Sequence, residues 1–170
     1  MLTRKSLITK WILYAFVLVL FSALQQLVLD QIRLLGVVPF LLPMVVAIVA
    51  AVEGPTGGAV FGLAVGVLAD LTGSGVFPGV YTLGFACAAL AVAVISKYWV
   101  MRSLFGAVIY ALLSFAALDA LQFLYLFFVQ GARPEVVASL AGREAAISLV
   151  FVIPIYLAYT RVYRVFDAEL

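Results

Sequence analysis

The chain has 170 residues, of which 67% are hydrophobic and 11% are charged, and its formal net charge is +2. A soluble domain of this length cannot hide so much apolar surface from water, so the composition excludes a soluble globular protein and indicates a membrane protein. Histidine is absent and Cys87 is the one cysteine, which excludes a disulfide framework and leads us to expect no metal, no cofactor and no nucleic-acid partner.

Six apolar stretches predict an all-α integral membrane protein with a single polytopic domain over residues 1–170. Each stretch is about long enough to cross a hydrocarbon core of about 30 Å as a helix. The predicted spans cover residues 11–29, 34–52, 55–71, 76–96, 103–129 and 143–159. The first has too long an apolar core for a signal peptide, so we expect an uncleaved span. The longest connection covers residues 130–142.

Prolines shape the second span and begin the third. Pro39 and Pro43 prevent a straight rod through the second span. A turn at Glu53-Gly54-Pro55 separates the two spans, and Pro55 suits the first position of the following helix.

Glycine recurs at every fourth residue of the third span, at Gly54, Gly58, Gly62 and Gly66. Residues four apart lie near one face of a helix, and a row of glycines lets another helix backbone come close. The row therefore predicts a contact surface. It either packs helices of this chain together or binds a helix of a partner protein.

The distribution of basic residues predicts the orientation. With six spans and a cytoplasmic N-terminus, seven basic residues lie inside, namely Arg4, Lys5, Lys10, Lys97, Arg102, Arg161 and Arg164, and three lie outside, namely Arg33, Arg133 and Arg143. A third span that only dips into the membrane would give five on each side. The positive-inside rule therefore favours a six-helix bundle with both termini in the cytoplasm.

This topology places several polar residues at one depth. Gln25, Gln26, Asp70 and Asp119 each lie about 21–24 Å from the cytoplasmic end of their span, at 1.5 Å per residue. We expect a polar layer beneath the outer surface, formed by Gln25, Gln26, Asp70, Asp119, Gln122 and Arg143. A buried carboxylate needs a partner. The layer is therefore either a ligand-recognition site or an internal contact of the aspartates with Arg143 or the glutamines.

Two intramembrane aspartates are also a feature of intramembrane aspartyl proteases, but neither Asp70 nor Asp119 follows a glycine here. Ser114 and Ser148 have no histidine to activate them. The sequence therefore predicts no enzyme.

The run from Val38 to Pro43, then Glu53-Gly54-Pro55, the glycine row and Asp70 resembles the rod shape-determining protein MreD family over residues 37–84. Many members carry an acidic residue where Phe40 stands here. The resemblance implies a non-enzymatic scaffold of the bacterial cell-elongation complex in the cytoplasmic (inner) membrane. Such a scaffold would maintain rod shape by organising cell-wall synthesis with the bitopic protein MreC, the actin-like MreB, and synthases of the RodA and penicillin-binding type.

The same resemblance implies a fold like the substrate-binding subunits of energy-coupling-factor transporters. The alternative function is therefore that of a membrane subunit that binds a vitamin or metal ion for transport. The two functions differ in their partner, which is another membrane protein in the first case and a small nutrient in the second.

Overall fold

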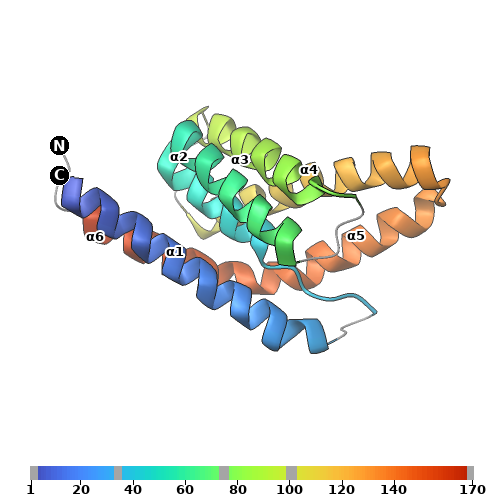
Figure 1. Ribbon diagram of the computed structural model, residues 1–170, viewed down its shortest axis with the longest axis horizontal. Helices are drawn as coiled ribbons and strands as arrows, with labels where there is room; N and C mark the ends of the chain where they lie inside the picture. The colour runs from blue at the N-terminus through green and yellow to red at the C-terminus, as the bar shows by residue number, and fades with distance from the viewer. Residues whose placement is uncertain (1–3, 33–35, 73–76, 99–102, 168–170) are drawn as a thin grey trace.

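The computed structural model describes residues 4–32, 36–72, 77–98 and 103–167 of the chain (Figure 1). Regular secondary structure in this part is helical: α1 (Arg4–Leu27), the 3-10 helix η1 (Leu29–Gln31), α2 (Leu42–Thr72), α3 (Val80–Tyr98), α4 (Leu104–Gln130), α5 (Pro134–Ser148), the 3-10 helix η2 (Leu149–Phe151) and α6 (Val152–Asp167). Five helical stretches of the described residues are long and apolar enough to cross a membrane, the fifth being α5, η2 and α6 together. The prediction of an all-α membrane protein is confirmed.

A sharp break at Gly54 divides α2 into two segments, residues 42–53 and 55–72. Gly54 has φ 79° and ψ −171°, a backbone conformation that glycine adopts without the steric cost of a Cβ atom. The second segment returns beside the first (Figure 1), and a methyl group built on Gly58 would lie 2.7 Å from Ala50 Cα. Pro55 begins the returning segment, where its missing N–H leaves no helical hydrogen bond unmade.

The first segment of α2 is the centre of the bundle. Every residue from position 41 to position 50 is buried, which is typical of a helix that is apolar on all sides. The helix begins only at Leu42, because Pro39 and Pro43 keep the preceding residues out of a continuous helix. The predicted second span therefore consists of an extended stretch followed by a short buried helix.

The glycine row packs the returning segment of α2 against other parts of the chain. A methyl group on Gly62 would lie 2.7 Å from the carbonyl oxygen of Phe85, and one on Gly66 would lie 2.5 Å from Thr82 Cα. Gly58 fits against Ala50 of the first segment, so these three glycines are filled from within the chain. The role of Gly58, Gly62 and Gly66 as a surface for a partner helix is therefore corrected: they are buried between helices of this protein.

The end of the fifth predicted span and the beginning of the sixth also differ from the prediction. Helix α4 ends at Gln130 and is capped by Gly131, whose φ of 62° suits glycine, and α5 begins at Pro134. Residues 134–142 of the predicted connection are therefore helical, and this helix continues into the predicted sixth span. The stretch from Pro134 to Phe166 is helical throughout and contains a 3-10 turn just before Pro154, where the proline removes a backbone donor.

Helices α1 and α6 lie side by side along one flank of the bundle (Figure 1). Their rings meet at Tyr14 and Tyr159, with centroids 5.5 Å apart. The start of α1 and the end of α6 lie at the same end of the molecule, which we call the terminal end. The other end, where α1 finishes, is called the opposite end.

The glycine packing generates a prediction about stability. Gly66→Ala should lower the free energy of unfolding by about 1–3 kcal/mol, because the added methyl group must displace the backbone of α3. Gly142→Ala is the matched control, since no atom lies within 4 Å of a methyl group at Gly142, which is also helical. Thermal unfolding of both variants in detergent checks this. Equal melting temperatures would contradict the packing.

Candidate functional site

Helix α1 is attached to the bundle along one narrow stripe. Its buried side chains recur every three or four residues, at Lys10, Tyr14, Leu18, Ser22 and Gln25, which places them on one helix face. The surrounding faces expose large apolar side chains such as Ile12 and Phe16. The stripe is polar at both ends, and α1 makes polar contacts with the bundle near each end.

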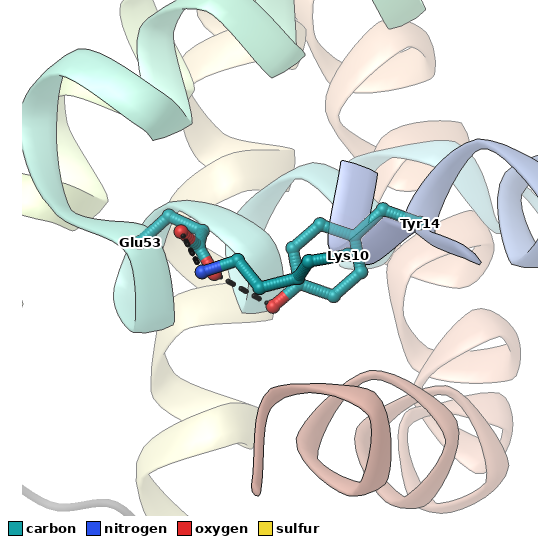
Figure 2. Close-up of polar contacts among 3 residues, drawn as sticks. All are labelled: Lys10, Tyr14 and Glu53. Atoms are coloured by element: carbon teal, nitrogen blue, oxygen red, sulfur yellow. Dashed lines mark hydrogen bonds and ion pairs between the residues drawn. The ribbon is translucent and has the colours of Figure 1, made fainter. Parts of the chain in front are cut away.

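At the terminal end, Glu53 joins α1 to the break in α2. Lys10 Nζ donates to Glu53 Oε2 at 2.7 Å, and Tyr14 Oη donates to Glu53 Oε1 at 2.7 Å (Figure 2). The side chains of Lys10 and Glu53 are only 7% and 10% exposed. Each carboxylate oxygen therefore has its own donor, and the buried charge of Glu53 is balanced by Lys10.

Sequence analysis assigned Lys10 to orientation and Glu53-Gly54-Pro55 to a turn, and it missed this contact. A signal for it was present. Lys10 and Tyr14 are one helical turn apart and share a face, and Glu53 comes at the end of a long uncharged run that begins at Leu34. A charge in such a place requires a partner at the same depth.

At the opposite end, Gln25 holds the extended stretch that precedes α2. Its side-chain oxygen accepts from the Leu41 N–H at 2.9 Å, and its side-chain nitrogen donates to the Pro39 carbonyl and to Asp30 Oδ1, both at 2.8 Å. Ser148 Oγ accepts from the Phe40 N–H at 2.8 Å. Backbone that is not helical is tolerated at membrane depth only when its polar groups are satisfied within the protein. Gln25 and Ser148 provide the hydrogen-bond partners for this extended backbone.

Asp70 caps the beginning of α3. Its carboxylate accepts from the backbone N–H groups of Tyr81 at 3.2 Å and Thr82 at 2.9 Å, and from Thr82 Oγ1 at 2.6 Å. The first N–H groups of a helix have no partner within the helix, and a negative charge there is also favoured by the helix dipole. Asp70 thus has a structural partner in α3, next to the close approach of Gly66 and Thr82.

The other residues expected in the polar layer do not form one layer with Gln25 and Asp70. Gln26 and Arg143 are exposed, and Arg143 has no ion pair with any residue in the part of the chain that the structure describes. Asp119 and Gln122 are half-buried on α4, and Asp119 lies close enough to Glu144 on α5 to act on it electrostatically. The expected contact of Arg143 with an aspartate is therefore wrong.

The position of Ser148 explains this correction. Because Ser148 contacts Phe40 beside Gln25, it marks the opposite end of the bundle. The other 14 residues of α5 precede it and extend about 21 Å along the helix axis. Helix α5 and the part of α4 beside it therefore project past the other helices (Figure 1). We call residues 119–148 the α4–α5 projection. Arg143 lies in it and not within the bundle.

A cavity of about 500 Å³ opens at the terminal end, next to the Glu53 contact. It lies between the α2 break, the end of α3, the start of α4 and the last turns of α6. Its charged lining residues are Glu53, Lys97 and Arg164. Gly54 and Pro55 form part of its wall, so the backbone reversal shapes it directly.

A family model described as rod shape-determining protein MreD matches residues 5–164 of the chain. The chain therefore belongs to the MreD family, and the resemblance noted in residues 37–84 is confirmed. It is a rod shape-determining, multi-pass protein of the bacterial inner membrane. Comparison with curated proteins and with solved structures finds no match.

The hydrogen bonds of Gln25 generate a second prediction. Gln25→Leu should lower the free energy of unfolding by about 1–3 kcal/mol or more, because it leaves the Leu41 N–H and the Pro39 carbonyl without partners. Gln26→Leu is the adjacent control, since Gln26 is exposed and its one side-chain contact, with Ser22, is 3.5 Å long. Thermal unfolding in detergent and abundance in the membrane measure both. A Gln26→Leu variant as unstable as Gln25→Leu would refute the proposed role of Gln25.

Proposed function

We propose that this MreD-family protein is a non-enzymatic scaffold of the cell-elongation complex. In this role it crosses the membrane six times as one domain, with both termini in the cytoplasm. It holds an MreC-like bitopic protein at the α4–α5 projection and thereby positions wall synthases of the RodA and penicillin-binding type relative to MreB. The observation that carries the proposal is the family match over residues 5–164, and the exposed apolar side chains of the α4–α5 projection support it.

The topology is supported by the course of α2. The chain reverses at Gly54. If each segment of α2 is one pass, the described helices account for the six passes of the proposal. An even number of passes agrees with the position of the start of α1 and the end of α6 at one end (Figure 1). That end also carries Lys97 and Arg164 in the last turns of α3 and α6, which supports a cytoplasmic location.

The first of these two passes is long enough only if the extended stretch is included. Residues 42–53 give about 18 Å as a helix. The extended residues 37–41 add about 16 Å. Together they match a hydrocarbon core of about 30 Å, and Gln25 with Ser148 supplies the partners that the extended part requires.

Single cysteines test this topology in a Cys87→Ala background. Tyr98→Cys and Arg133→Cys are suitable because both native side chains are exposed. In intact spheroplasts, a membrane-impermeant maleimide should label position 133 and should label position 98 only after lysis. Labelling of position 98 from outside, with position 133 protected, would overturn the six-pass orientation.

The α4–α5 projection supports binding of a partner protein on the outer side. It exposes large apolar side chains, with Phe128 75%, Val129 65% and Val136 52% exposed. In the proposed topology these lie beyond the level of Ser148, toward the outer surface. Exposed apolar patches mark sites of contact with another protein or with the membrane, and the proposal assigns this one to a partner protein. Gly58, Gly62 and Gly66, in contrast, already pack against other parts of the chain.

Replacement of Phe128 by aspartate tests the scaffold role. In a rod-shaped host that lacks its own copy, Phe128→Asp should fail to restore rod shape, and its recovery of the MreC-like protein in pull-down should fall at least fivefold. The matched control is Phe105→Asp, at the other end of the same helix and 65% exposed. Both variants should reach the membrane at similar abundance.

Two results would contradict the proposal. Normal rods and full partner recovery with Phe128→Asp would remove the α4–α5 projection as the binding surface. Tight binding of a vitamin or metal ion to the purified protein, with cell shape indifferent to its deletion, would favour the transporter alternative. Against that alternative, Gln25 and Asp70 of the expected ligand layer are already bonded to groups of the chain itself.

A further inference from the structure

The cavity at the terminal end has an apolar interior and a charged rim. Ile48, Ala93 and Ala107 form part of its inner wall, and all three are buried in the bundle. Lys97 and Arg164 line it from the last turns of α3 and α6, and both are exposed. The cavity is thus amphipathic from its mouth inward.

The charge of the rim is positive. Glu53 also lines the cavity, but its carboxylate is held by Lys10 and Tyr14, and neither of these is a lining residue. The negative charge of Glu53 is therefore compensated from outside the cavity. Lys97 and Arg164 form no ion pair with the residues that the structure describes. Within the described part of the chain, these two positive charges have no carboxylate partner, so they are available to an anion in the cavity.

The depth of the cavity fits a lipid and not a free anion. Ile48 lies five residues before Glu53, about 8 Å along the helix, and Tyr156 lies eight residues before Arg164, about 12 Å along α6. Both line the cavity, so it continues about 8–12 Å from the charged rim into apolar surroundings. A small inorganic anion would leave that depth empty, whereas the first carbons of an acyl chain would fill it.

We propose that this cavity binds an anionic membrane lipid. The lipid phosphate lies between Lys97 and Arg164, and the upper part of an acyl chain lies along the wall formed by Ile48, Ala93 and Ala107. Basic pockets between transmembrane helices on the cytoplasmic side are suited to anionic headgroups. The cavity lies at the terminal end and the α4–α5 projection lies at the opposite end. Partner binding and lipid binding therefore do not compete for one surface.

This proposal is tested on the purified full-length protein, reconstituted with phosphatidylglycerol and phosphatidylcholine in equal amounts. Native mass spectrometry after detergent exchange measures the lipid retained. The wild-type protein should retain phosphatidylglycerol preferentially. Lys97→Gln combined with Arg164→Gln should reduce that retention at least fivefold. Arg161→Gln controls for general attraction to anionic lipid, because Arg161 is exposed, lies one turn from Arg164 and does not line the cavity.

A second variant separates the cavity from the charged surface around it. Ala51 is half-buried in the wall, so Ala51→Leu reduces the space while leaving Lys97 and Arg164 unchanged. Its retention of phosphatidylglycerol should also fall at least fivefold, and circular dichroism and melting temperature should confirm that it is folded. If a folded Ala51→Leu variant retains lipid normally, the acyl chain does not occupy the cavity.

Three further outcomes would overturn the proposal. These are equal losses in the Arg161→Gln control and in the double variant, equal retention of phosphatidylcholine and phosphatidylglycerol, and displacement of the retained lipid by a soluble acidic peptide. The last result would assign the cavity to a protein segment. None of these measurements uses cell shape or a partner protein, so failure here leaves the scaffold proposal standing.

Discussion

The fold depends on how the chain satisfies polar groups where its helices are interrupted inside an apolar bundle. The reversal at Gly54 follows Glu53, whose buried carboxylate takes both of its donors from α1. The extended stretch before α2 obtains its partners from Gln25 and Ser148. In lipid no water replaces these contacts, so polar side chains from a distant part of the chain stabilise both of these interruptions.

This requirement also limits where the protein interacts with other molecules. Gln25, Glu53 and Asp70 all serve the chain's own backbone or its own helices, and the glycine row is filled from within. What remains open lies at the two ends, the α4–α5 projection at one and the amphipathic cavity at the other. This arrangement agrees with the proposed scaffold role, in which the two ends contact other molecules on the two sides of the membrane.

Sequence patterns predicted those features that depend on local chemistry. Composition predicted a helical membrane protein, and the turn at Glu53-Gly54-Pro55 lies where the backbone reverses. Gln25 is buried as expected. The similar depths of the polar residues could not predict their partners. Those depths were counted as if every span began at the membrane surface. Arg143 lies in the third turn of α5, past Ser148, so its predicted level was wrong. The glycine row was consistent with internal packing or partner binding, and only the neighbouring backbone of Phe85 and Thr82 distinguishes these.

The most direct test of this account is a double-mutant cycle on Lys10 and Glu53. Each single change, Lys10→Met or Glu53→Gln, should be strongly destabilising, by about 3–5 kcal/mol for a fully buried pair, because it leaves an uncompensated charge. The double variant removes both charges, so in thermal unfolding it should recover at least half of the loss of the less stable single variant. Losses that simply add would show two independent side chains and would contradict the account.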